Sequence, residues 1–259
     1  MRKRLGRFLN QRIELFGAPM DALTMEDTVR QIDRRISDGQ FTQHVVVNVA
    51  KVVQMRDDPE LAAAVRGCDI INIDGAGIVF GGRFLGLKIP HRVAGIDLFL
   101  ELLAYAEGEG RSVYLLGATE AVIEKTVSRL RTDYPGLKIA GYHHGYFWNE
   151  EAATVARIRE SGADMLFVGI GSPLKERFID RWRDELGVKF AMGVGGSFDV
   201  VSGKVHRAPQ WMQRAGLEWF YRVIQEPRRM WRRYLVTNTR FLGMLALEKW
   251  RSVSRKVRR

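Results

Sequence analysis

The sequence predicts an α/β protein whose mainly parallel sheet is covered by helices, followed by a basic helical appendage at the C-terminal end. Short runs rich in β-branched residues alternate with longer stretches in which apolar residues recur every three or four positions. Strands that alternate with helices of this length are typical of a parallel sheet with helices on both faces. The appendage is predicted from a second observation, the concentration of positive charge after residue 203.

Six runs are the strand candidates, and two of the stretches between them carry helix signals. One helix candidate contains Ile123, Val127 and Leu130 and is entered through Thr119, a residue type that favours helix starts. The other spans residues 173–186 and opens with a proline, which suits a first helical turn because it lacks an N–H group. The strand candidates are residues 44–49, 69–73, 113–116, 137–140, 164–169 and 189–194. Together these elements predict a Rossmann-like arrangement.

The composition is that of a folded protein from a reducing compartment. The chain has 259 residues, of which 46% are apolar and 27% charged, so it can bury a sizeable core. Its single cysteine, Cys68, excludes a disulfide framework and a thiolate metal cluster. The basic start lacks the apolar run of a signal peptide, and no window is apolar enough to span a membrane. We therefore expect a protein of the cytoplasm.

The net charge of +11 is concentrated in the last part of the chain. Residues 204–259 contain 15 Lys and Arg against 3 Asp and Glu, a net charge of +12, whereas residues 1–203 have a net charge of −1. Four of the six tryptophans also lie in the last part: Trp211, Trp219, Trp231 and Trp250. We predict a near-neutral α/β body over residues 1–203 and a basic, tryptophan-rich helical appendage over residues 204–259.

Four of the strand candidates end in glycine-containing turns, at residues 74–77, 116–119, 169–173 and 193–197. In an open parallel sheet, ligands bind outside the carboxyl ends of the strands. Glycine there lets the backbone approach a ligand closely, and the N-terminus of the following helix attracts anions. A single turn of this kind has another explanation, because any tight connection from a strand to a helix needs glycine. Four of them on one edge favour a nucleotide or another phosphorylated small molecule.

Other patterns narrow the class of protein and leave two alternatives open. Residues 75–81 read G-x-G-x-x-x-G, which differs from the dinucleotide fingerprint but leaves an NAD(P)-dependent oxidoreductase as one alternative. The sequence has no G-x-x-x-x-G-K-[ST] loop, no Asp-x-Asp pair and no metal-ligand spacing of histidines, so arginine or lysine must neutralise a pyrophosphate. The basic appendage makes a non-catalytic membrane- or nucleic-acid-binding module the other alternative. Nucleic acid ranks lower, because no helix-turn-helix, zinc-finger or RNP pattern accompanies the charge.

The glycine turns and several blocks of the appendage resemble the WecG/TagA/CpsF glycosyltransferases (glycosyltransferase family 26). The blocks follow the family's order from about Asn48 to Tyr234. The matching stretches are residues 74–77, 92–98, 169–173 with Glu176, 193–199, 207–211, 216–219, 221–222, 226–227 and Arg229. Two positions depart from the family pattern, because Val46 stands where the family has threonine and Lys175 where it has glutamine.

The resemblance implies an inverting transfer of a sugar from a UDP-sugar to a polyprenyl-diphosphate-linked sugar, in cell-surface polysaccharide synthesis. It implies that the enzyme needs no metal or other cofactor. It also implies a peripheral protein at the inner face of the cell membrane, in contact with anionic lipid, and makes a homo-oligomer an expected state. No nucleic acid partner is expected. Residues 1–203 would then be the nucleotide-sugar-binding catalytic body.

The resemblance also assigns site residues. Asp74 is the expected general base, because it matches the family's D-G-x-G aspartate and follows an apolar run that would place it at the carboxyl end of a strand. Two alternatives stand beside this: Asp74 caps the next helix, or Asp97 or Asp199 is the base. The expected substrate-binding residues are Asn48, Arg92, Asp97, Gly117, Gly169, Gly171, Ser172, Lys175, Glu176, Gly195, Asp199, Arg222, Arg229 and Arg232.

The appendage is expected to complete the site and to touch the membrane. Arg222, Arg229 and Arg232 are seven and three residues apart, which places them on one face of a helix where they would bind the leaving pyrophosphate. The alternative is a solvated basic face, which is expected for Arg228 and Arg233. An apolar stripe flanked by arginines would lie on an anionic leaflet, or else pack on the body. Its members are Trp231, Leu235, Phe241, Leu242 and Leu245.

Lys175 adds a positive charge on the loop before a helix, beside the expected pocket. We expect it to pair with the pyrophosphate of the donor or with a carboxylate on an acidic sugar. The alternative is an ordinary solvated lysine.

Overall fold

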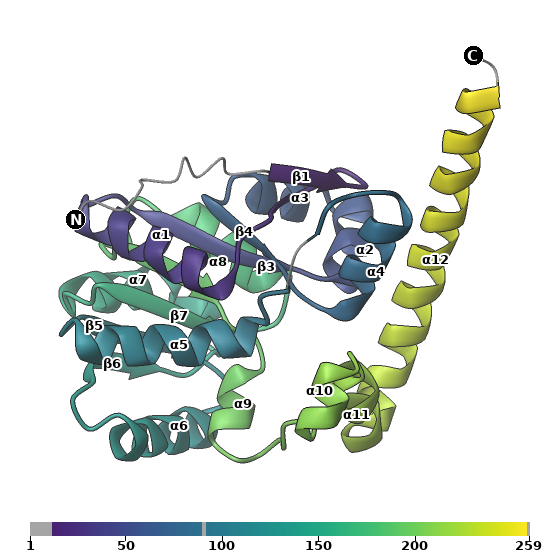
Figure 1. Ribbon diagram of the computed structural model, residues 1–259. Coiled ribbons are helices and arrows are strands. Elements are labelled where there is room, and N and C mark those ends of the chain that lie inside the picture. Colours follow the sequence, from purple (N-terminus) through teal and green to yellow (C-terminus); the bar gives the residue numbers. More distant parts are fainter. Residues whose placement is uncertain (1–11, 90–91, 258–259) are drawn as a thin grey trace, which may run out of the picture.

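The computed structural model describes residues 12–89 and 92–257, which form one sheet of eight strands and the helices around it (Figure 1). The strand order is β1-β2-β4-β3-β8-β7-β5-β6. Within the described residues, β1 and β2 pair antiparallel and the other neighbours pair parallel. The strands are β1 Arg12–Leu15, β2 Ala18–Asp21, β3 Thr42–Val47, β4 Ile70–Ile73, β5 Ser112–Gly117, β6 Lys138–His143, β7 Met165–Gly169 and β8 Phe190–Gly193. The predicted α/β, mainly parallel fold is confirmed.

All six predicted strands are present, as β3 to β8, whereas the N-terminal hairpin of β1 and β2 was not predicted. Its strands are four residues each and one contains Pro19, so neither shows a clear alternation of apolar residues. The helices are α1 Met25–Ser37, α2 Val49–Asp57, α3 Pro59–Arg66, α4 Ala76–Phe84, α5 Gly95–Gly108, α6 Glu120–Asp133, η1 Trp148–Glu150, α7 Glu151–Glu160, α8 Leu174–Trp182, α9 Ser197–Val201, α10 Gln210–Arg214, α11 Glu218–Gln225 and α12 Pro227–Val257. The helix expected over residues 173–186 is therefore shorter, since α8 ends at Trp182.

Alternate residues of the strands face two different layers of helices. Leu115 and Phe167 lie in the core beneath α1, α5 and α6, where Phe167 meets Phe99 edge to face at 4.9 Å. Their neighbours Leu116 and Val168 lie on the opposite face, in a cluster with α7 and α8. A further cluster on that face joins α2, α3 and α4 to the β1–β4 half of the sheet. The period of two along each strand thus gives both faces an apolar cover.

The carboxyl ends of β5 and β7 form a switch point of the topology. The chain leaves β5 through α6 toward the sheet edge, and leaves β7 through α8 toward the centre, on the opposite face. Gly117 and Gly169, the last residues of these strands, are register partners. Gly117 has φ +137°, and a Cβ atom there would lie 2.6 Å from the Gly169 backbone, so only glycine fits. Ligands of open α/β sheets bind in the crevice at such a point.

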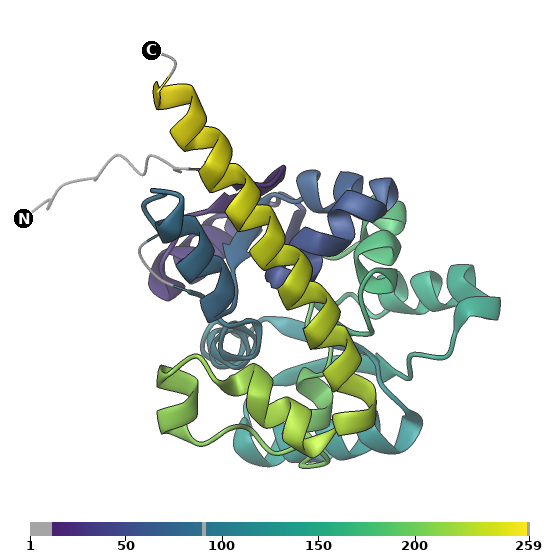
Figure 2. The same ribbon diagram turned by 90° about the vertical axis from the view of Figure 1, so that its right-hand side faces the viewer.

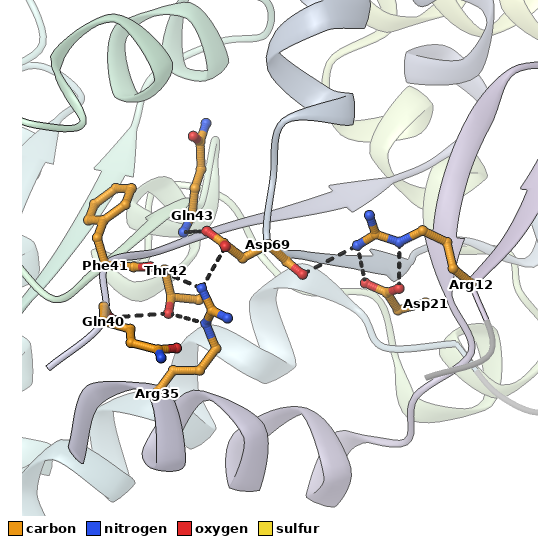
Figure 3. A network of polar contacts seen from close by, with 8 residues as sticks. All are labelled: Arg12, Asp21, Arg35, Gln40, Phe41, Thr42, Gln43 and Asp69. Carbon is orange, nitrogen blue, oxygen red and sulfur yellow. Dashed lines mark hydrogen bonds and ion pairs between the residues drawn. The ribbon is translucent and has the colours of Figure 1, made fainter. Parts of the chain in front are cut away.

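A polar network ties the amino ends of β3 and β4 to α1 and to the hairpin, at the opposite edge from this crevice (Figure 3). The Arg35 guanidinium donates to Thr42 Oγ1 at 2.7 Å and to Asp69 Oδ1 at 2.5 Å, and the backbone N–H of Gln43 donates to Asp69 Oδ2. Arg12 donates to both carboxylate oxygens of the buried Asp21 at 2.9 and 3.0 Å. The charges in this network pair with one another and link the sheet to α1 and to the hairpin.

The last helix, α12, crosses the body and packs on it with one face only (Figure 2). Phe241 and Leu245 are each 3% exposed and join the core cluster of α2 and α4. Trp231, Leu235 and Leu242 are 54–59% exposed on another face. The five residues predicted as one apolar stripe therefore belong to two faces, because Phe241 and Leu245 lie one turn apart on the side that meets α4. No helix in the described residues is both long and apolar enough to cross a membrane.

Candidate active site

Asp74 lies at the carboxyl end of β4, where the ends of two strands and two helices meet. Its backbone N–H donates to the Val47 carbonyl at the end of β3 (2.9 Å). Its carboxylate accepts the backbone N–H groups of Gly75 and Gly95, at the starts of α4 and α5. Val46, one of the two departures from the family pattern, lies beside it: its Cγ2 is 3.3 Å from where a Cβ of Gly95 would sit. The backbone thus aims Asp74 into the site.

The surroundings of Asp74 suit a proton acceptor. Burial raises the pKa of Asp74 to about 6, opposed by the positive charge of Arg92 and reinforced by the negative charge of Glu218. Arg92 and Glu218 themselves form an ion pair of 2.7 Å (Nη1 to Oε2). The N-cap residue of α4 is Gly75, with φ +86°, and not Asp74, although the Asp74 carboxylate accepts N–H groups at the starts of α4 and α5. A carboxylate whose pKa lies near the operating pH is an efficient general base.

Three charged side chains are buried together at the carboxyl ends of β3 and β8. Lys51 Nζ and Lys175 Nζ contact the same oxygen of Glu176, Oε1, at 2.6 and 2.8 Å. All three side chains are at most 10% exposed. The stem of Lys175 lies on Gly193, where a Cβ would be 2.6 Å from its Cδ. The ordinary solvated lysine that was the alternative for Lys175 is therefore wrong.

The triad of Lys51, Glu176 and Lys175 carries one positive charge in excess. Burial alone would raise the pKa of Glu176, but the two ammonium groups hold it well below its usual range. Burial and the charge of Lys51 lower the pKa of Lys175 to about 8, against the attraction of Glu176. An uncompensated buried cation is costly, and an anionic ligand would offset that cost.

Asn48 connects the triad to the loop of Asp74. It is the N-cap of α2, and its Oδ1 accepts the backbone N–H of Lys51 at 3.0 Å. Its Cβ lies 3.9 Å from the place of a Cβ on Gly75. Asn48 therefore positions both the helix that carries Lys51 and the edge of the site.

The appendage reaches the same edge through α11 and the start of α12. Arg222 lies against Gly196 at the end of β8, where a Cβ would be 2.7 Å from its Nη2. Arg207 holds Asp97 of α5 at 2.6 Å. Burial raises the pKa of Tyr234, on α12. The charges of Arg233 and Arg222 oppose this rise, and the charge of Asp74 adds to it. Arg233 is exposed, as expected, and its positive charge lowers the pKa of Lys175.

The remaining predicted residues are spread along the carboxyl edge. Gly171 and Gly195 face open space, whereas a Cβ on Gly169 would collide with the Phe198 ring. The Ser172 hydroxyl is buried and without a hydrogen-bond partner in the described part of the chain. Asp199 pairs with Lys204 at 3.1 Å.

Of the three predicted pyrophosphate arginines, Arg222 lies on α11 and Arg229 and Arg232 lie on α12, so the expectation that they share one helix face is wrong. Arg232 is exposed on α12, and the side chain of Arg229 lies outside the described residues. Sequence reasoning gave no role to several residues that the structure places here, namely Lys51, Arg207, Glu218 and Tyr234. Arg207 and Glu218 lie in stretches that match the family, but Lys51 carries no local signal.

A cleft of about 860 Å³ opens beside Asp74, between α4 and α10. Ala76, Phe80 and Phe84 of α4 line it, and so does Arg92, whose charge acts on Asp74. The site thus has a half-buried proton acceptor, a cluster of cations and an adjoining cavity. A parallel sheet with these features at its carboxyl edge is typical of an enzyme that binds a phosphorylated substrate and moves a proton.

Comparison with known proteins defines the enzyme further. The model of the glycosyl transferase WecG/TagA/CpsF family matches residues 13–255. An N-acetylglucosaminyldiphosphoundecaprenol N-acetyl-beta-D-mannosaminyltransferase of Bacillus subtilis (strain 168) is 39% identical over 202 residues, covering 74% of this chain and 78% of the relative. The protein of the same name from Bacillus spizizenii (strain ATCC 23059 / NRRL B-14472 / W23) is 40% identical over 178 residues, 69% of this chain and 68% of the relative. The chain belongs to the WecG/TagA/CpsF family of glycosyltransferases, so neither the oxidoreductase nor the non-catalytic module holds.

Proposed function

We propose that this glycosyltransferase moves a sugar from a UDP-sugar to a polyprenyl-diphosphate-linked sugar, with inversion and without a metal ion. The names of both relatives describe an acceptor of this kind, an N-acetylglucosaminyl diphosphoundecaprenol. The observation that carries the proposal is Asp74, a carboxylate with a pKa of about 6 at the carboxyl end of β4. The cations of the buried triad and of the appendage lie at the same edge of the sheet. The donor sugar is left open, because Val46 and Lys175 both lie at the site.

In the proposed reaction, an acceptor hydroxyl attacks the anomeric carbon of the donor while Asp74 takes the hydroxyl proton. The bond from that carbon to the diphosphate oxygen breaks, and UDP leaves with the electron pair. Attack on the side opposite to UDP inverts the configuration. Asp74 would contribute about 10²–10⁴-fold to the rate, the usual range for a positioned base.

The departing UDP carries negative charge that cations must stabilise. Arg222 at Gly196 and Lys175 at Gly193 both lie at the end of β8, and Arg233 acts on Lys175 from α12. Charge-assisted bonds of this kind contribute roughly 1.5–3 kcal/mol each. We propose that these side chains, with Arg229 and Arg232 from the same helix, bind the diphosphate.

The proposal places the enzyme on the anionic inner face of the cell membrane, where a lipid-linked acceptor resides. Trp231, Leu235 and Leu242 are more than half exposed on α12. Arg228 and Arg251 are exposed on the same helix. A helix with exposed apolar and basic side chains binds in the plane of an anionic interface.

The experiment is a panel of UDP-sugars offered with lipid-diphosphate N-acetylglucosamine, with and without EDTA, and read by mass spectrometry. We expect one sugar to be added, equally well in EDTA, with the anomeric configuration inverted by NMR. Absence of product with every UDP-sugar would contradict the reaction. Activity lost in EDTA and restored by a divalent ion would contradict metal independence alone.

A further inference from the structure

The cleft between α4 and α10 is an amphiphilic cavity that the proposed chemistry does not use. Phe80 and Phe84 lie one turn apart on α4, are 63% and 43% exposed, and stack with their ring centroids 6.3 Å apart and their planes 15° apart. They form a flat apolar wall on one side of the cleft. Large side chains left exposed together on a well-packed helix usually mark a binding surface.

The wall is held rigidly from behind. Ile78, Gly81 and Gly82 on the other side of α4 are buried, and a Cβ on Gly81 would lie 2.8 Å from the Phe241 ring of α12. The Arg83 guanidinium donates to the Ile89 carbonyl at 3.0 and 3.2 Å. The rings are thus presented to the cleft by a fixed helix rather than by a loop.

The charge of the cleft complements an anion. Three arginines line it, Arg83, Arg92 and Arg214, and no Asp or Glu lines it among the described residues. Arg92, which pairs with Glu218 at 2.7 Å, also acts on the charge of Asp74. The cleft therefore combines the stacked rings of Phe80 and Phe84 with arginine side chains, which matches a molecule with an anionic head and a hydrocarbon tail.

We propose that this cleft binds the first isoprene units of the acceptor lipid, with Phe80 and Phe84 against the hydrocarbon and Arg92 and Arg214 toward the diphosphate. The inference rests on the proposed function, because it takes the acceptor to be a polyprenyl diphosphate. The tail would leave the cleft near Phe84, whose ring lies 5.0 Å from the Lys249 ammonium of α12. That helix also carries the exposed side chains proposed to face the membrane.

The test compares the binding of farnesyl diphosphate and inorganic pyrophosphate by calorimetry, with no donor present. The wild-type protein should bind farnesyl diphosphate at least tenfold more tightly. Phe80→Ser and Phe84→Ser should each weaken farnesyl diphosphate binding about tenfold, because the ligand can no longer bury the exposed ring, and leave pyrophosphate binding unchanged. Arg214→Gln should weaken the binding of both ligands.

Tyr146→Ser is the matched control, since Tyr146 is 71% exposed and outside the cleft. It should change neither affinity. Equal affinities of the wild-type protein for both ligands, or phenylalanine variants that behave like the control, would overturn the isoprenoid site. Displacement of farnesyl diphosphate by UDP would also overturn it, because the cleft would then be the nucleotide site.

A second measurement separates this inference from the proposed function. The wild-type protein is assayed for sugar transfer to N-acetylglucosamine diphosphate esterified with farnesyl or with methyl. A lower KM for the farnesyl acceptor supports the isoprenoid site. Equal KM values would leave the transferase reaction standing and reject the cleft as its lipid site. Farnesyl diphosphate bound through Phe80 and Phe84, without transfer to any acceptor, would reject the reaction and retain the site.

Discussion

The pKa of Asp74 links its position to a measurable pH dependence. A general base, the role proposed for Asp74, must be ionised, and burial raises the pKa of Asp74 to about 6. The carboxylate is therefore present above pH 6 and lost as the pH falls through that value. A neighbouring acid without this burial would lose its charge nearer pH 4.

For Asp74→Asn we expect a turnover lowered about 10²–10⁴-fold with an unchanged affinity for UDP. The wild-type kcat/KM should fall below about pH 6, the pKa of Asp74. Steady-state kinetics across pH and calorimetry with UDP measure both. Asp97→Asn and Asp199→Asn are the comparisons, and near-normal turnover of the Asp74 variant would transfer the role to one of them.

Lys175→Gln restores the residue type of the family pattern and tests the charge of the buried triad. The pKa of Lys175 is lowered to about 8, so its positive charge is present below that pH and declines as the pH rises through it. We expect the wild-type affinity for the donor to fall above about pH 8 and the variant to lack that step.

The choice of donor tells which anion Lys175 meets. Loss of affinity for both a neutral UDP-hexose and a UDP-hexuronic acid in Lys175→Gln indicates contact with the diphosphate. Loss for the hexuronic acid alone indicates contact with the carboxylate. Unchanged affinity for both would show that Lys175 does not bind the donor.

At the scale of elements, the contact of α11 with the loop after β8 brings the appendage to the carboxyl edge of the sheet. Arg222 occupies the space that a side chain on Gly196 would need, with Nη2 2.7 Å from that Cβ position. The backbone of Gly196 has φ −79°, which alanine adopts without strain. Gly196→Ala therefore displaces a guanidinium without deleting it.

We expect Gly196→Ala to lower turnover in the same direction as Arg222→Ala, with the melting temperature unchanged. The double variant should be no slower than Arg222→Ala, because both changes remove the same interaction. If the losses of turnover from the two changes add fully in the double variant, Arg222 does not act through its contact with Gly196. Turnover and thermal melts of the three variants measure this.

The seam between α12 and α4 predicts a sharp difference between neighbouring residues. Phe241 is 3% exposed and meets Phe16 edge to face at 5.8 Å, whereas Leu242 is 57% exposed. Phe241→Ala should lower the free energy of unfolding by about 3–5 kcal/mol, as for other buried aromatic residues. Leu242→Ala should stay within about 0.5 kcal/mol of the wild type in the same urea titration. Equal effects would mean that α12 does not pack on the body through this face.

At the scale of the whole molecule, the appendage is both part of the core and a charged projection. All the strands lie before residue 203, yet Phe241 and Leu245 complete the core cluster of α2 and α4. Removal of everything after residue 203 would therefore expose apolar surface of the body. The end of α12 instead projects beyond the body (Figures 1 and 2) and can be shortened separately.

Deletion of residues 248–259 removes Trp250 with six basic residues and one acidic residue. We expect an unchanged melting temperature, since Leu245 and the seam remain. Binding to vesicles of anionic lipid should weaken strongly, because each basic residue near such a surface contributes about 1 kcal/mol. Sedimentation of the protein with anionic and with neutral vesicles measures this binding. Undiminished binding to anionic vesicles would place membrane contact elsewhere on the protein.

The sequence alone determined the parts of this protein that depend on local pattern. The alternation of β-branched runs and helical stretches predicted strands β3 to β8, because each element must turn an apolar face toward a core. The glycine turns predicted the edge of the sheet where Asp74 and Arg222 lie, since glycine is needed where backbones approach closely. The charge of residues 204–259 marked the appendage.

The tertiary structure alone decided which of these residues meet. Lys51 and Glu176 are 125 positions apart and pair only because β3 and β8 are neighbours in the sheet. The same holds for the burial that raises the pKa of Asp74, for the division of α12 between Phe241 and Trp231, and for the α4–α10 cleft. Burial and electrostatic energy depend on distances between side chains, and residues far apart in the chain acquire those distances only when the sheet forms.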